Sequence, residues 1–178
     1  GVPVTMAKTG VKYLHHAALG FDLGVYFEAN GHCTGLFSET FLSYVNSLPT
    51  EQLQGSTRSA LALRRLVAFT RVINQAVGDA ISDMLATIAL LHIAGLDLVG
   101  WKALYTELPS RQLKAPHARK ALIRCSDDET RALEPLMLQP LLDTAMAAQP
   151  CGRCFVRPSG TEDVVRVYAE AETQAQAD

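Results

Sequence analysis

The chain carries the stretch Arg157-Pro158-Ser159-Gly160-Thr161-Glu162-Asp163 between two short apolar runs. We expect the runs, residues 154–156 and 164–170, to form strands that enter and leave a compact loop. Arginine has a planar fork that matches phosphate oxygens, and glycine lets successive backbone N–H groups face an anion. The stretch is therefore a candidate phosphate site. The alternative is an ordinary tight turn in which Pro158 and Gly160 are only turn residues.

The strand after the loop adds a second cation. Side chains alternate between the two faces of a strand, so Val165 and Val167 can face a core while Arg166 and Tyr168 face a ligand on the other side. Ser159 is interpreted as a hydroxyl donor and not as a nucleophile, because no base is placed for it and the G-x-S-x-G pattern is absent. The candidate phosphate-binding residues are Arg157, Ser159, Gly160, Thr161 and Arg166.

A second polar cluster lies near the start of the chain. Residues 21–38 have the pattern of two strands joined by the strong turn signal Asn30-Gly31. Glu28, Asn30 and His32 would then meet at the tip of a hairpin. A carboxylate accepts hydrogen bonds from sugar hydroxyls, and an amide both donates and accepts. The cluster is a candidate sugar-binding loop, with an Asn-Gly turn among incidental polar residues as the alternative.

Both motifs resemble a known family. Residues 157–170 resemble the phosphate-binding loop of the α-D-phosphohexomutases. The full sequence RPSGTEDVVRVYAEA is similar to that loop in the phosphoacetylglucosamine mutase branch of the family. The segment Phe27-Glu28-Ala29-Asn30-Gly31-His32 resembles the sugar-binding loop of the same branch. The segments Thr9-Gly10-Val11-Lys12 and Asn74–Leu85 also resemble that branch, in the same order along the chain.

The resemblance implies a fold and a division into domains. It implies an α/β plus α+β architecture, with the later part of a mixed α/β sugar-binding domain at residues 1–109. A small α+β phosphate-binding domain follows at residues 110–178. The boundary is placed at Pro109-Ser110. By resemblance, the chain is a C-terminal piece that covers the later part of the third domain and most of the fourth.

The resemblance also implies a reaction. The family member would be an isomerase that interconverts N-acetylglucosamine 6-phosphate and N-acetylglucosamine 1-phosphate, on the route to UDP-N-acetylglucosamine. A phosphoserine and a bisphosphate intermediate carry the phosphoryl group, with Mg²⁺ on an aspartate-rich loop. Neither a T-A-S-H-N-P serine loop nor a D-x-D-x-D metal loop occurs in this sequence. We therefore expect the Mg²⁺ ligands and the catalytic serine outside this chain, and the chain alone to be inactive.

The expected partners are the phosphosugar and the missing N-terminal domains of the same protein. Lys12 resembles a lysine near the sugar and is a weak catalytic candidate, since a surface lysine fits as well. Two other functions stay open. One is a non-catalytic protein that binds a sugar phosphate, and the other is a mutase for a different hexose phosphate.

Composition excludes several protein classes. The formal charge of −2 argues against nucleic acid or an anionic membrane surface as the main partner. Four cysteines are too few and too scattered for a disulfide scaffold. Cys151 and Cys154 form a lone C-x-x-C without a second ligand pair, so no metal site is predicted. The longest apolar run contains His92 and Asp97 and is too short to span a membrane. A cytoplasmic location is therefore expected.

Helical periodicity predicts the remaining elements. Apolar spacing indicates helices over residues 56–73 and 77–91, the second ended by Gly95. Asp97 is expected to cap a helix that runs to Leu108. The pattern Ser126-Asp127-Asp128-Glu129 has the form of a capping box, which predicts a helix to about residue 133. A last helix is expected over residues 141–148.

Overall fold

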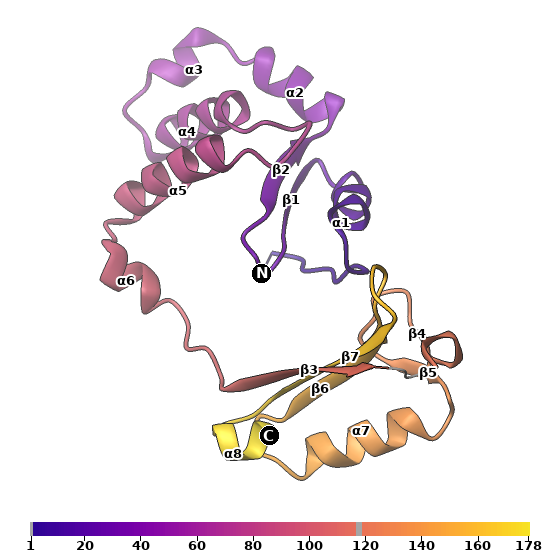
Figure 1. Cartoon of the computed structure of the whole chain (residues 1–178). Helices are drawn as coiled ribbons and strands as arrows, with labels where there is room; N and C mark the ends of the chain where they lie inside the picture. The colour runs from indigo at the N-terminus through magenta and orange to yellow at the C-terminus, as the bar shows by residue number, and fades with distance from the viewer. Residues whose placement is uncertain (1, 117–118) are drawn as a thin grey trace. The chain divides into compact units, whose positions relative to one another are not determined.

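The computed structural model describes residues 2–116 and 119–178. The chain forms two compact units, which are described separately (Figure 1). One unit contains residues 10–104, and the other combines residues 2–9 with residues 105–178. Helices and strands occur in both units, which confirms the predicted mixture of the two.

The first unit is built around a β-hairpin. Strands β1 (Leu23–Phe27) and β2 (Cys33–Phe37) pair antiparallel, with Phe27 opposite Cys33 next to the turn. The predicted hairpin is therefore present. Helix α1 (Val11–Ala18) packs on β1, and a Cβ on Gly24 would lie 2.3 Å from the carbonyl oxygen of Ala18. A glycine is required there because helix and strand touch through their backbones.

Five further helices complete this unit, and capping side chains fix where four of them begin. Ser38, Thr57, Asp79 and Asp97 each accept a hydrogen bond from a backbone N–H of the first turn that follows. Gly95 ends α5 in the left-handed conformation, with φ 67°, as predicted. The helices are α2 (Glu39–Asn46), α3 (Thr50–Gln54), α4 (Arg58–Val72), α5 (Ala80–Ala94) and α6 (Leu98–Lys102).

Helix α6 is shorter than predicted. It ends at Lys102 and not at Leu108, and the apolar side chains Leu104 and Tyr105 beyond it are exposed. Apolar spacing alone therefore does not extend this helix, because tertiary packing supplies most of the stability of a helix.

Helix α5 turns small residues toward its neighbours. Its buried residues are Ser82 and Ala86, which are four apart and so share a face. Ala86 joins Phe37 and Ile73 in a core cluster. Four side chains of the apolar stripe that predicted the helix are more than half exposed, and within the described residues of this unit nothing covers them. They are Ile81, Met84, Leu85 and Ile88.

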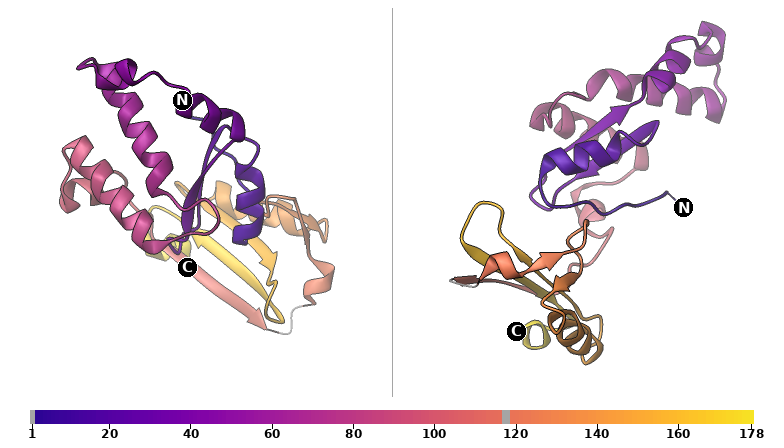
Figure 2. Two further views of the ribbon diagram at one scale, coloured as in Figure 1. Left: turned by 90° about the horizontal axis from the view of Figure 1, so that it is seen from above. Right: turned by 90° about the vertical axis from the view of Figure 1, so that its right-hand side faces the viewer.

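The second unit is built on a three-stranded antiparallel sheet (Figures 1 and 2). Strand β7 (Val164–Glu170) lies between β3 (Ser110–Pro116) and β6 (Arg153–Pro158). Helices α7 (Leu138–Ala147) and α8 (Gln174–Ala177) lie on one face of it (Figure 2). The thiol of Cys154 donates to the carbonyl of Leu142 in α7, so the face that carries Cys154, Val156 and Val165 is the helix-covered one.

The predicted helix over residues 126–133 is wrong. Strands β4 (Arg124–Cys125) and β5 (Ala132–Glu134) pair antiparallel, and a turn joins them. Asp128 accepts hydrogen bonds from the Ser126 hydroxyl and from the backbone and hydroxyl of Thr130. Short polar side chains that cap helices also close turns in this way, and here the turn forms. A 3₁₀ helix (Lys120–Leu122) precedes β4.

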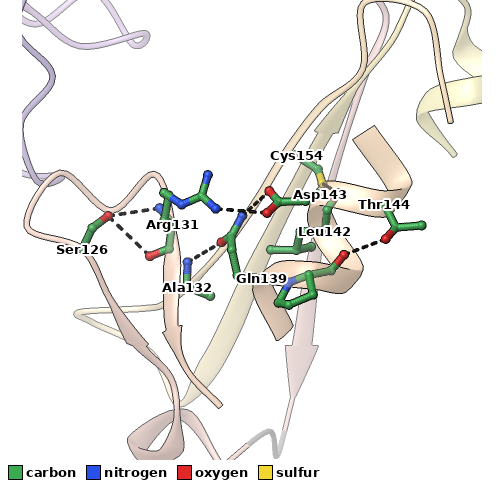
Figure 3. A network of polar contacts seen from close by, with 9 residues as sticks. Ser126, Arg131, Ala132, Gln139, Leu142, Asp143, Thr144 and Cys154 are labelled. Atoms are coloured by element: carbon green, nitrogen blue, oxygen red, sulfur yellow. Dashed lines mark hydrogen bonds and ion pairs between the residues drawn. The ribbon is translucent and has the colours of Figure 1, made fainter. Parts of the chain in front are cut away.

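Helix α7 begins three residues earlier than predicted, at Leu138. Pro140 is tolerated because it lies in the first turn, where a backbone N–H has no partner within the helix. The amide of Gln139 accepts from the backbone of Ala132 at 2.7 Å and donates to Asp143 at 2.8 Å, and Arg131 donates to Asp143 at 3.0 Å (Figure 3). These contacts fasten the β4–β5 turn to the helix.

Over the described residues, no helix has the length and apolar character needed to cross a bilayer.

Candidate functional site

The tip of the β1–β2 hairpin brings the three predicted sugar-binding residues together. The N–H of Gly31 donates to the carbonyl of Glu28, and the N–H of Glu28 donates to the carbonyl of His32, both at 2.9 Å. Gly31 has φ 89°, a conformation that side chains rarely adopt. The side-chain oxygen of Asn30 accepts from the N–H of His32 at 2.9 Å. Asn30 therefore closes the turn with its oxygen.

The side chains of Glu28 and His32 face one another. Glu28 Oε2 lies 3.7 Å from His32 Nδ1, and both side chains are partly exposed. This end of the hairpin offers carboxylate acceptors, an amide and an imidazole within five residues. Such a group can satisfy several neighbouring hydroxyls at once.

A neighbouring segment holds the hairpin in place. Thr34 Oγ1 donates to the carbonyl of Asn74 at 2.6 Å, and the N–H of Phe37 donates to the side chain of Gln75 at 2.8 Å. A Cβ on Gly78 would lie 2.4 Å from Cδ2 of His32. The segment Asn74–Leu85 thus supports the tip. Sequence reasoning missed the role of Gly78, which only the packing reveals.

Lys12, His15 and His16, all in helix α1, have different surroundings. Lys12 is exposed in the first turn of α1, and its Nζ lies 4.9 Å from the ring centroid of Tyr13. His15 packs edge-on against Tyr26, and its Nδ1 lies 3.4 Å from the tyrosine oxygen. His16 is exposed. The pair His15-His16 therefore does not point at one ligand.

The β6–β7 loop is organised around Ser159. This residue is only 5% exposed, and its N–H donates to the carbonyl of Val164 at 3.0 Å. Its Oγ accepts from the N–H groups of Thr161 and Glu162 at 3.4 and 3.2 Å, and from Nε of Arg166 at 3.4 Å. The hydroxyl predicted to bind phosphate thus also shapes the loop. Gly160 has open space at its Cβ position.

Three cations form a row across the sheet on the face opposite α7. Arg157 of β6 is paired with Arg166 of β7, and Arg166 is paired with Lys114 of β3. Paired residues of antiparallel strands share a face and lie close together. Like charges placed directly opposite destabilise a sheet. The concentration of these cations beside a loop in which Gly160 and Thr161 are exposed is typical of an anion site.

Two carboxylates accompany this row. Glu162 accepts from Lys114 at 2.8 Å and from Arg166 at 2.6 Å, and Glu129 lies 3.5 Å from Arg157. The hydrogen bond from Lys114, followed by the charges of Lys114 and Arg166, lowers the pKa of Glu162. Sequence reasoning missed Lys114 and Glu129. No local signal marks either, because each enters only through strand register or a long-range contact.

Tyr168 does not join the phosphate loop. Its ring stacks on Phe155 with centroids 5.0 Å apart, and its hydroxyl donates to Glu170. Burial is the main cause of the raised pKa of Tyr168, followed by the hydrogen bond to Glu170. Arg153 also binds Glu170, at 2.8 Å. The far ends of the two strands thus hold this side chain away from Arg166.

Neither the cysteines nor the acidic residues form a metal site in the described part of the chain. Cys33, Cys125, Cys151 and Cys154 are free thiols. Burial raises the pKa of the Cys154 thiol, which disfavours the thiolate that binds metals. Within residues 2–116 and 119–178, no group of three His, Cys, Asp or Glu residues is placed to hold an ion.

Family profiles match both units. The profile described as phosphoacetylglucosamine mutase AMG1, domain III, matches residues 1–96. This chain belongs to the phosphoacetylglucosamine mutase family. The profile of the phosphoglucomutase/phosphomannomutase C-terminal domain matches residues 124–178. The family predicted from the sequence motifs is confirmed.

Individual mutases agree with this assignment. The phosphoacetylglucosamine mutase of rice is 50% identical over 181 residues, which is 100% of this chain and 32% of the rice protein. The human phosphoacetylglucosamine mutase is 50% identical over 177 residues, covering 99% of this chain and 32% of the human protein. The chain therefore spans about a third of the length of the curated relatives it matches.

Solved mutase structures share the fold. The Aspergillus fumigatus N-acetylphosphoglucosamine mutase, crystallised with GlcNAc-6P and magnesium, aligns with a TM-score of 0.87 at 45% identity. The alignment covers 97% of this chain and 31% of that one. An N-acetylglucosamine-phosphate mutase of the α-D-phosphohexomutase superfamily, in its substrate complex, aligns with a TM-score of 0.86 at 42% identity, covering 96% and 31%.

Proposed function

We propose that the full-length protein interconverts N-acetylglucosamine 6-phosphate and N-acetylglucosamine 1-phosphate. In this proposal the chain supplies two ligand loops of the enzyme and is inactive alone. The observation that carries the proposal is the row of Arg157, Arg166 and Lys114 beside the exposed loop residues Gly160 and Thr161. Family membership supports the choice of a phosphosugar as the anion.

The hairpin tip recognises the sugar hydroxyls in this proposal. Glu28 accepts hydrogen bonds from two hydroxyls, and the amide nitrogen of Asn30 donates while its oxygen closes the turn. His32 contacts the sugar or steadies Glu28 at its present distance of 3.7 Å. This group has to accept the sugar in two orientations, because either phosphate end reacts in turn.

The β6–β7 loop grips the phosphate that is not reacting. Arg157 and Arg166 direct their guanidinium groups to its oxygens, and the backbone N–H of Gly160 and the hydroxyl of Thr161 donate further hydrogen bonds. Ser159 donates its hydroxyl hydrogen while its oxygen accepts from the loop. Binding energy gained at this end contributes to the chemical step at the other end of the substrate.

The domain assignment belongs to the same proposal. Residues 1–109 would be the later part of the sugar-binding domain, and residues 110–178 the phosphate-binding domain. Support comes from the profile matches at residues 1–96 and 124–178.

Magnesium is proposed for the full-length enzyme, where it would neutralise charge on the moving phosphoryl group. The described residues do not fit a metal site, so its ligands would come from another part of the protein. We propose that the catalytic phosphoserine lies outside this chain, because the sequence contains no T-A-S-H-N-P serine loop. A cytoplasmic location is also proposed, since the four free thiols suit a reducing compartment.

The proposal is tested by the mutase activity of the full-length protein. N-acetylglucosamine 6-phosphate and glucose 6-phosphate are compared side by side, with and without Mg²⁺. A Mg²⁺-dependent preference for the N-acetylated sugar supports the proposal. Preference for glucose 6-phosphate would move the substrate to another hexose phosphate. No turnover of either would favour a protein that only binds sugar phosphates. Turnover by the 178-residue chain alone would contradict its assignment as an incomplete enzyme.

A further inference from the structure

A nearly buried carboxylate contacts Arg157 from the β4–β5 turn. The side chain of Glu129 is only 13% exposed, and its Oε2 lies 3.5 Å from NH1 of Arg157. The same oxygen accepts from the backbone N–H of Thr9 at 3.2 Å. A guanidinium has five N–H donors, so this contact leaves most of the fork available to a second anion.

The backbone of Glu129 is in an unfavourable conformation. Its φ is 58°, in the left-handed region that glycine and asparagine adopt most easily. The turn around it is braced, because Asp128 accepts hydrogen bonds from Ser126 and Thr130. Arg131 of the same turn binds Asp143 of α7 (Figure 3). Strained backbone of this kind is concentrated at active sites and ligand-binding segments.

The cation row explains why Arg157 needs this carboxylate. Arg157 lies directly opposite Arg166, and repulsion would turn its guanidinium away from the shared face. Arg166 has Glu162 as a counter-charge, and the side chain of Glu162 is 41% exposed. Glu129 provides the corresponding charge for Arg157 from a more enclosed position.

The pKa of the neighbouring Cys125 thiol depends on the charges of Glu129 and Arg157. Burial raises the pKa of Cys125, and the negative charge of Glu129 raises it further. The positive charges of Arg157 and Lys8 act in the opposite direction. Glu129, Arg157 and Lys8 therefore lie around one partly buried group.

We propose that Glu129 is a positioning residue that holds the guanidinium of Arg157 in the orientation that grips phosphate. The proposal rests on the proposed function, in which the β6–β7 loop binds the phosphate of the substrate. Glu129 itself does not touch the substrate. It acts through Arg157, and phosphate binds to the donors of the fork that Glu129 leaves open.

The test uses the full-length protein, with KM and kcat for N-acetylglucosamine 6-phosphate and the unfolding midpoint as readouts. E129G removes the carboxylate while it relaxes the backbone, so it should raise KM about tenfold and change the midpoint little. E129Q keeps an acceptor oxygen at the same reach, so its rise in KM should be several-fold smaller. D127A, which removes an exposed carboxylate from the same turn, is the matched control and should leave KM unchanged.

A double-mutant cycle with R157A shows whether Glu129 acts through Arg157. The double variant E129G/R157A should have the KM of R157A alone, because the group that Glu129 orients is already gone. Fully additive effects, or an E129G variant with the parent KM, would overturn the proposal. So would an E129Q variant that binds substrate more tightly than the parent, since Glu129 would then compete with phosphate. If R157A itself leaves KM unchanged, the phosphate-loop assignment fails, and the inference fails with it.

Discussion

Replacing Gly78 by alanine perturbs the sugar-binding loop without replacing any residue assigned to the ligand. The new Cβ would lie 2.4 Å from Cδ2 and 2.6 Å from Nε2 of His32, and 2.8 Å from the carbonyl oxygen of Cys33. Carbon atoms pack at about 3.5–4.0 Å, so all three contacts are too short. His32 can swing away, but then it leaves Glu28. The carbonyl of Cys33 belongs to a paired strand and cannot move alone.

The expected magnitude follows from these contacts. Forcing an extra methyl into a packed site costs about 1–3 kcal/mol. If the displaced loop loses one hydrogen bond to the sugar that involves a charged group, about 1.5 kcal/mol of binding is lost. That loss corresponds to about a tenfold rise in KM. We therefore expect Gly78→Ala to lower the unfolding midpoint and to raise KM for N-acetylglucosamine 6-phosphate about tenfold.

The assay combines steady-state kinetics with thermal unfolding of the full-length protein. Gly35→Ala is the matched control, because it adds the same methyl group to β2. Its Cβ would meet the side chains of Ile73 and Phe69 at 3.6 Å, an ordinary contact distance. This control should keep the parent KM and the parent midpoint. If Gly78→Ala behaves like Gly35→Ala, the close support of His32 by residue 78 is refuted.

Three other predictions concern the two loops and the response to acid. Arg157→Ala in the full-length protein should raise KM and lower kcat together, with kcat/KM falling about 10- to 100-fold in steady-state kinetics. The reason is that charge-assisted hydrogen bonds to phosphate are lost in both the ground state and the transition state. Unchanged KM and kcat would count against the assignment of the phosphate loop. Glu28→Ala should weaken binding of N-acetylglucosamine and leave the affinity for inorganic phosphate unchanged, as measured by calorimetry; equal losses for both ligands would contradict the division of roles. Hydrogen bonds from Ser126 and then from Thr130 lower the pKa of Asp128. Because the folded-state pKa lies below the unfolded value of about 3.9, the stabilisation is present above that pH and is lost as the pH falls through the folded value. Unfolding midpoints measured from pH 6 to about pH 2 should fall, and Asp128→Asn should weaken that dependence.

Local patterns predicted the parts of the fold whose causes are local. The turn signal Asn30-Gly31 indicated one pair of strands, and the apolar runs on either side of residues 157–163 indicated another. Both pairs are present. The helix expected from Ser126 to residue 133 is wrong, because the same residue types that cap a helix also close the turn around Asp128.

Features that depend on packing or register could not be predicted. Lys114 joins Arg166 only through the pairing of β3 with β7. Glu129 reaches Arg157 only because a turn forms where a helix was expected. Helix α5 packs against the rest of its unit through the small residues Ser82 and Ala86. Its hydropathy pattern does not reveal which face of the helix is covered.

The central claim is that the hairpin tip binds the sugar and the β6–β7 loop binds phosphate. Hydrogen exchange of the full-length protein tests it directly, with N-acetylglucosamine, inorganic phosphate and N-acetylglucosamine 6-phosphate as separate ligands. We predict protection of residues 28–32 by the sugar, of residues 157–166 by phosphate, and of both segments by the phosphosugar. Protection of neither segment by the phosphosugar, at a concentration that saturates the protein, would contradict the account.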